Sequence, residues 1–245
     1  TITSPSSYLN FSNSSNLAEA TSGQDWASGN VNNVEQATDT CTNNFCTGNN
    51  LVRFTNPSSQ VVTEGATLMT KGANGYETIS GTIYVTRGKW YCEVQSILNS
   101  ATTAYCSVMP DDSPIIAAGG AISHYPGSRS GDGGVSYYAN NGNKYLDGGN
   151  SAYGNDWKSG TGLGDIMGIA LDMDNGKIYY HLNGTYYDDA SGNVPNPATP
   201  ANHNHSFTVP SNGLAFFVSV LRYNTSTIAI ETNFGNPSYS ISSGI

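Results

Sequence analysis

The stretch GDIMGIALDMDNGKIYYHLNGTYY, residues 164–187, decides the fold class. An apolar run at 166–171 is followed by Met-Asp-Asn-Gly, and the strand-like segment 177–182 leads to a second Asn-Gly pair at 183–184. Asn-Gly pairs adopt the positive φ angles of tight hairpin turns at little steric cost. The stretch therefore predicts three antiparallel strands joined by two tight turns.

The apolar pattern of this meander also predicts which residues are buried. Residues 166–171 are continuously apolar, which is typical of a central strand covered on both faces. In the next strand, Ile178, Tyr180 and Leu182 occupy alternate positions. Alternate residues of a strand point to the same face, so we expect these three in the core.

Further strands are expected on both sides of the meander. In the segment 89–95, Trp90, Cys92 and Val94 share one face, opposite Tyr91, Glu93 and Gln95. The remaining predicted strands span 81–88, 105–109, 214–221 and 227–233, together with 135–138 and 144–146, which flank Asn141-Gly142 and are expected to form a hairpin. Helix-favouring residues are scarce, whereas β-branched, aromatic and turn-forming residues are abundant. The sequence therefore predicts an all-β protein.

Composition excludes several functional classes. The 245 residues include 9 basic and 18 acidic side chains, for a formal net charge of −9. Phosphate binding needs clustered Lys and Arg, so we expect no nucleic-acid partner. The acidity also disfavours anionic membrane surfaces. No apolar run approaches the roughly 20 residues of a membrane helix, so we expect no membrane insertion.

The chain is expected to divide into two parts. Residues 1–35 are rich in Ser and Asn with few apolar residues, which predicts an extended arm or linker. Residues 36–245 are predicted to form one β-sandwich domain. The chain begins at Thr1 without a recognisable signal peptide, so we expect a processed product or a piece of a longer protein.

The four cysteines, Cys41, Cys46, Cys92 and Cys106, leave the redox state open. Their spacing does not match a zinc site. Cys92 and Cys106 lie in predicted strands, where either a cross-strand disulfide or two buried free thiols is compatible with the pattern.

Four segments, in this order, resemble the SPRY family. Gly88-Lys-Trp-Tyr-Cys-Glu-Val94 resembles the family's Gly-Lys-Trp-Tyr-Trp-Glu-Val strand, with Cys92 in place of an aromatic residue. Gly164–Lys177 is similar to its Gly-Asp-Val-Ile-Gly-Val-Ala-Leu-Asp strand and turn, Leu182-Asn-Gly184 to its Lys-Asn-Gly turn, and Asn233–Pro237 to its closing Asn-Phe-Gly-x-x-Pro. The resemblance covers roughly 40–240 and implies a concanavalin-like jelly-roll sandwich of two antiparallel sheets.

Two further segments, Thr40–Thr47 and Pro195–Ala201, resemble parts of SPRY-like domains in bacteriophage proteins. This resemblance implies a binding module, not a catalyst, at the virion surface or on a tail fibre. We expect the arm to contact other virion or fibre proteins, the domain to recognise a host cell-surface glycan or protein, and a homo-oligomer to be possible by analogy with fibres. No cofactor is expected.

A group of aromatic and polar residues lies in the most Gly/Asn-rich third of the chain. Aromatic rings bind sugars by stacking, and polar neighbours hydrogen-bond the hydroxyl groups. The candidate ligand-binding residues are Tyr125, Arg129, Asp132, Tyr137, Tyr138, Tyr145, Tyr153 and Trp157. The alternative is that these aromatic residues only pack the sheet.

Other candidate sites have simpler explanations. Asp172-Met-Asp-Asn-Gly176 begins like a calcium loop but has Asn183 where the loop needs Glu, so we interpret it as a hairpin turn. His203 and His205 are too few for a tight metal site, and no metal is expected. Glu93 and Glu231 are the acids placed most clearly in strands, which keeps a polysaccharide-cleaving enzyme as a rival hypothesis.

The sequence thus favours a non-catalytic binding or display module. The other rivals are a purely structural capsid decoration and a surface-filament subunit whose arm donates a strand to its neighbour.

Overall fold

The computed structural model describes residues 45–49, 60–63, 65–71, 75–98, 104–114, 124–153, 163–187, 194, 196–200, 215–223 and 227–235. The predicted arm at 1–35 lies outside these residues, as do Cys41, Trp157, His203 and His205. None of the described helical segments is long and apolar enough to cross a membrane.

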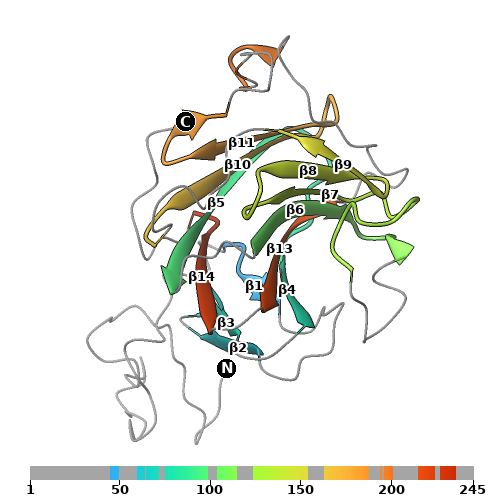
Figure 1. The fold of residues 1–245 in the computed structure, drawn as a ribbon. Helices are drawn as coiled ribbons and strands as arrows, with labels where there is room; N and C mark the ends of the chain where they lie inside the picture. Colours follow the sequence, from blue (N-terminus) through green and yellow to red (C-terminus); the bar gives the residue numbers. More distant parts are fainter. Residues whose placement is uncertain are drawn as a thin grey trace, which may run out of the picture.

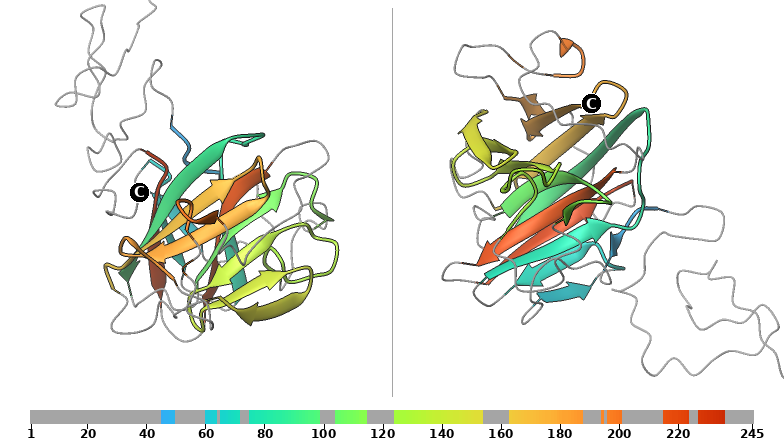
Figure 2. Two further views of the ribbon diagram at one scale, coloured as in Figure 1. Left: turned by 90° about the horizontal axis from the view of Figure 1, so that it is seen from above. Right: turned by 90° about the vertical axis from the view of Figure 1, so that its right-hand side faces the viewer.

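The described strands form two antiparallel sheets (Figure 1 and Figure 2). The first sheet runs in the order β1 (Gly48–Asn49), β4 (Gly75–Gly81), β13 (Ala215–Tyr223), β6 (Ala104–Pro110), β7 (Val135–Tyr138), β8 (Asn143–Leu146), β9 (Gly149–Ala152). The second runs β12 (Thr185–Tyr186), β11 (Lys177–Leu182), β10 (Ile166–Asp172), β5 (Lys89–Leu98), β14 (Ile228–Asn233), β3 (Leu68–Lys71), β2 (Gln60–Thr63). The all-β sandwich is confirmed.

The predicted meander is present. β10 pairs with β11 across the Asp-Asn-Gly turn, and β11 pairs with β12 across the turn at Asn183 and Gly184. Asn183 has a φ of 50° and Gly184 one of 84°, the left-handed conformation that the Asn-Gly pair predicts. β10 lies between β11 and β5, which confirms that it is a central strand. The hairpin of β7 and β8 is also confirmed.

Both sheets contribute alternate side chains to one core. The second sheet supplies Cys92, Val94, Met167, Ile169, Leu171, Ile178 and Tyr180, with Leu182 packed at the margin. The first supplies Ala104, Cys106, Val108, Val135, Tyr137 and Phe217. The predicted inward positions of β11 are confirmed. Trp90 is an exception, because it is 43% exposed and its indole N–H donates to the Arg87 carbonyl at 2.7 Å.

Cys92 and Cys106 face the core from opposite sheets, and both thiols are free. Burial raises the pKa of Cys106 to about 12 and that of Cys92 well above its usual value. Of the two alternatives for Cys92 and Cys106, the structure has two buried free thiols, not a disulfide. Cys46 is also a free thiol.

A buried ion pair joins the two sheets at one end of the sandwich. Lys71, the last residue of β3, places its Nζ 3.2 Å from Oε1 of Glu77 on β4. The two side chains are 0% and 1% exposed, so neither charge is solvated by bulk water. Each charge therefore depends on the other for its stabilisation.

Candidate functional site

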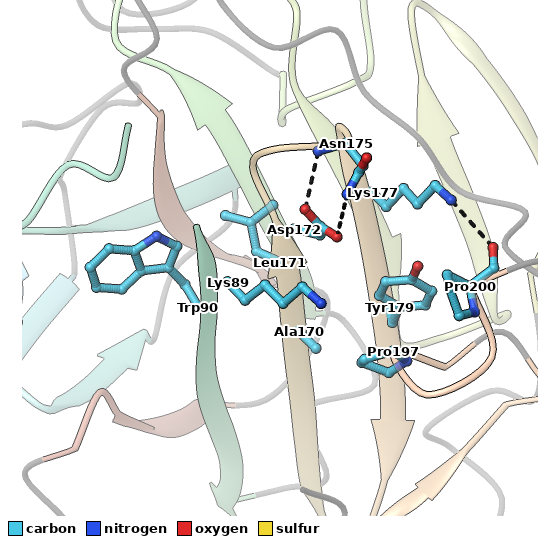
Figure 3. A pocket seen from close by; sticks show the side chains of 10 residues that line it. All are labelled: Lys89, Trp90, Ala170, Leu171, Asp172, Asn175, Lys177, Tyr179, Pro197 and Pro200. Atoms are coloured by element: carbon cyan, nitrogen blue, oxygen red, sulfur yellow. Dashed lines mark hydrogen bonds between the residues drawn. The ribbon is translucent and has the colours of Figure 1, made fainter. Parts of the chain in front are cut away.

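A groove crosses the outer face of the second sheet, beneath the segment 196–200 (Figure 3). It consists of two adjoining pockets with volumes of about 230 and 370 Å³, which share Lys89, Trp90, Ala170 and Pro197. Pockets of this size accommodate small organic ligands or a few sugar rings. The groove is therefore the candidate functional site.

Strand alternation places the floor of the groove. Lys89 and Tyr91 on β5 point away from the core because Cys92 and Val94 point into it. The register pairs Tyr91 with Ala170, and Ala170 in turn with Tyr179 on β11. The small side chain of Ala170 thus separates two tyrosines in one row across the sheet.

The smaller pocket is polar at one end. Asp172 on β10 is paired with Lys89 on one side and Lys177 on the other. Its carboxylate accepts hydrogen bonds from the backbone N–H and the Nδ2 of Asn175, at 3.1 and 2.9 Å. Lys177 Nζ donates to the Pro200 carbonyl at 3.3 Å, which ties the overlying segment to the sheet (Figure 3).

The larger pocket is mainly aromatic and aliphatic, with Trp90, Tyr91, Tyr186, Pro197 and Ala198 in its walls. Burial raises the pKa of Tyr186 to about 12, so its hydroxyl stays protonated at neutral pH and can donate a hydrogen bond. Large rings with a polar tip offer contact area at a small cost in conformational entropy.

A buried hydrogen-bond chain holds Tyr91 in place. The Gly184 N–H donates to His181 Nδ1 at 3.0 Å, so the imidazole proton resides on Nε2. Nε2 lies 2.7 Å from the Tyr91 hydroxyl and donates to it, and that hydroxyl donates to Glu93 Oε1. His181 and Glu93 are both 0% exposed. The chain of donors ends on a buried carboxylate.

This arrangement favours binding over hydrolysis. Among the described residues that line the groove, Asp172 is the only carboxylate. Hydrolysis of a glycosidic bond ordinarily uses two carboxyl groups flanking the bond. Glu93 and Glu231 lie on the same face of the sheet, since Glu231 is paired with Gln95 and Asn233 with Glu93, but neither lines the groove.

The architecture matches solved structures of one family. The SPRY domain of human HERC1 superposes with a TM-score of 0.54 at 14% identity, covering 78% of this chain and 99% of that one. The fold is SPRY-like. A second human SPRY domain gives a TM-score of 0.49 at 14% identity, covering 74% and 98% of the two chains. No family model and no curated protein matches the sequence.

Within this SPRY-like domain, the tyrosines predicted to form a ligand surface are divided between two places. Tyr137 and Tyr153 are both 0% exposed and pack with Tyr180 and Tyr187 in the core. Assigning them to a ligand surface is wrong, because no part of either ring is accessible. The strand alternation of β7 could have shown this for Tyr137, since Val135 points the same way.

The other three form a cluster on the outer face of the first sheet. Tyr105 stacks on Tyr125 with centroids 3.9 Å apart and on Tyr138 at 4.1 Å, and Tyr145 meets Tyr125 edge-on at 5.1 Å. Tyr105 and Tyr138 are buried, whereas Tyr125 and Tyr145 are half-buried. Tyr125 and Tyr145 thus remain accessible, on the sheet opposite the groove.

The polar candidates Asp132 and Arg129 also differ in solvent exposure. Asp132 is 1% exposed, and its carboxylate accepts hydrogen bonds from the backbone N–H groups of Gly127, Arg129 and Gly134 at 3.0, 3.1 and 2.9 Å. It organises the loop instead of facing a ligand, so its predicted binding role is wrong. Arg129 is exposed beside this loop. Trp157 lies outside the described residues.

The turn interpretation of Asp172–Gly176 is confirmed by the bonds from Asn175 to Asp172. The sequence analysis nevertheless missed the groove. Its residues come from four strands, the turn at Asn175 and the segment 196–200, and only the register brings Lys89, Ala170 and Tyr179 together. The signal available was the row of Lys and Tyr at alternate, outward positions of β5 and β11.

Proposed function

We propose that this SPRY-like domain is a non-catalytic binding module that takes a glycan of a cell surface into the groove on its second sheet. The single observation that carries the proposal is the combination of the rings of Tyr91 and Tyr186 with the hydrogen-bonding groups of Asp172 and Asn175 in one concave site. Apolar walls with a few fixed polar groups are typical of small-ligand sites.

The rigidity of the site supports this function. Tyr91 is held by the bonds to His181 and Glu93, and Asp172 is held by its bonds from Asn175. Side chains fixed before binding lose little entropy when a ligand arrives. The resemblance to the SPRY family, whose members commonly act as interaction modules, points in the same direction.

The proposal is tested by glycan-array and calorimetric binding of purified protein. We expect Tyr186→Ala to weaken binding at least about tenfold, the loss of one stacking platform worth about 1.4 kcal/mol. Tyr84→Ala, which removes another exposed ring away from the groove, is the matched control and should leave affinity unchanged.

A third variant separates the groove from the tyrosine cluster. If Tyr125→Ala abolishes binding while Tyr186→Ala does not, the ligand site lies on the first sheet. If no glycan binds the wild-type protein, the binding function is overturned in favour of a structural role.

The biological setting is proposed separately. We propose, on the resemblance of Thr40–Thr47 and Pro195–Ala201 to phage segments, that the domain is displayed on a virion or tail fibre and that its arm contacts neighbouring virion proteins. Mass spectrometry of purified particles tests the location. Light scattering of the purified chain tests whether it forms a homo-oligomer.

A further inference from the structure

Two lysines flank one carboxylate at the polar end of the groove. The register sets Lys89, Asp172 and Lys177 side by side on β5, β10 and β11. All three line the smaller pocket. Figure 3 shows the Lys89 side chain extending from β5 across β10 toward Tyr179, and Lys177 reaching toward Pro200 on the far side.

The described residues do not neutralise the positive charge at the polar end of the groove. Among the described residues, the ion pair within 4.0 Å joins Lys71 and Glu77, which lie elsewhere in the fold, and neither groove lysine has a carboxylate oxygen of a described residue within that distance. Lys177 donates to a neutral carbonyl, and Asp172 is engaged by Asn175. The three side chains together carry a net charge of +1.

This local charge stands out against the rest of the molecule. The whole chain has a formal net charge of −9 with only nine Lys and Arg residues, of which two line this one pocket. A protein of this charge repels anions at a distance, so an anion that binds here must be held by short-range contacts. An ammonium group on a flexible stem is well suited to a single carboxylate.

We propose that the groove binds a carboxylated saccharide, such as a uronic-acid-containing glycan, with its carboxylate accepting from Lys89 and Lys177 on the solvent side of Asp172 and its ring on Tyr91 and Tyr186. This inference rests on the proposed glycan-binding function and specifies its ligand class. A peptide ligand fits less well, because both lysines and the carboxylate gather at one end of the groove, whereas the rest of its lining is mainly aromatic and aliphatic.

The test uses paired ligands: an oligosaccharide of alternating glucuronic acid and N-acetylglucosamine, an oligomannuronate, and the carboxyl-reduced form of each. Wild-type protein is expected to bind at least one carboxylated form at least about fivefold more tightly than its reduced form. The preference should shrink as salt rises from about 50 to about 500 mM, because exposed charge pairs are screened.

Variants assign the effect to the lysines. Lys89→Gln with Lys177→Gln should abolish the preference for the carboxylated form, whereas Lys89→Arg with Lys177→Arg should retain it. Lys144→Gln on the first sheet removes one positive charge without touching the groove and is the matched control. Thermal unfolding of every variant confirms that the fold is intact.

The outcomes separate the two proposals. Equal binding of carboxylated and reduced forms, or an undiminished preference in the double Gln variant, overturns the carboxylate inference and leaves glycan binding standing. Failure of every saccharide here and on the glycan array overturns both. Selective binding of a peptide that the double Gln variant loses would replace the saccharide with another class of ligand.

Discussion

Gly168 and His181 are paired residues on β10 and β11, and a β-carbon added at Gly168 would lie 1.9 Å from His181 Nε2. The imidazole ring occupies the space that any side chain at 168 would need. Because His181 is 0% exposed and bonded at both ring nitrogens, it cannot yield without breaking the chain of bonds to Tyr91.

Gly168→Ala is therefore expected to destabilise the protein by about 3 kcal/mol, from overpacking and the loss of a buried hydrogen bond. Urea unfolding measures this. Gly149→Ala on edge strand β9 is the control, since its nearest neighbour would be 3.5 Å away, and it should change stability by no more than about 0.5 kcal/mol. Equal effects of the two substitutions would contradict the steric argument.

The buried pair of Lys71 and Glu77 predicts a non-additive effect. Glu77→Leu alone leaves an uncompensated ammonium with 0% exposure and should cost about 3–5 kcal/mol. Lys71→Met with Glu77→Leu removes both charges and should cost less than either single change. A double-mutant cycle by chemical denaturation checks the prediction, and simple additivity of the two single substitutions would argue against a direct coupling.

Stability is expected to fall in mild acid because of His181. Desolvation lowers the pKa of His181 below its usual 6.5, although the charge of Glu93 opposes this. The unfolded chain then binds more protons than the folded one, so the contribution of His181 is complete above about pH 6.5 and is lost as pH falls toward the lower folded pKa. Tyr91, Glu93 and Tyr186 face the ring.

Urea titrations at several pH values between about 8 and about 5 measure this dependence. His181→Gln removes the titrating group, so its stability should vary less with pH over this range than that of the wild type. A variant curve parallel to the wild-type curve would assign the acid sensitivity to another group.

Asp132→Asn should destabilise the loop that covers the outer face of the first sheet. The substitution replaces one carboxylate oxygen by an NH₂ group, which cannot accept from the N–H of Gly127, Arg129 or Gly134. We expect a loss of about 2–3 kcal/mol, measured by thermal and urea unfolding. Asp147→Asn is the control, because Asp147 is exposed and accepts from Gly131 alone; it should cost under about 1 kcal/mol.

Local features of the fold could be predicted from the sequence because they depend on neighbouring residues. The Asn-Gly pairs predicted the turns, and the inward positions Ile178, Tyr180 and Leu182 followed from the period of the strand. The resemblance to SPRY segments supplied the sandwich architecture, with which the HERC1 comparison agrees.

The candidate site could not be predicted in the same way. Tyr137 and Tyr138 are adjacent in sequence and equally aromatic, yet one lies in the core and the other on the outer face. Composition treats such neighbours alike, whereas the pleat of a strand sends them to opposite sides. Asp132 was predicted to bind a ligand, but its carboxylate already accepts hydrogen bonds from three backbone N–H groups of its own loop.

By itself, the sequence determined the meander, its tight turns and the inward-facing residues of β10 and β11, because hairpin turns and side-chain alternation are set by residues a few positions apart. Only the tertiary structure decided that Lys89 of β5 stands in one row with Asp172 and Lys177, that a segment around Pro197 covers them, and that Lys71 meets Glu77 between the sheets. The row depends on the register between β5 and β10, which are distant in the chain, and the ion pair depends on how the two sheets stack; no local pattern specifies either.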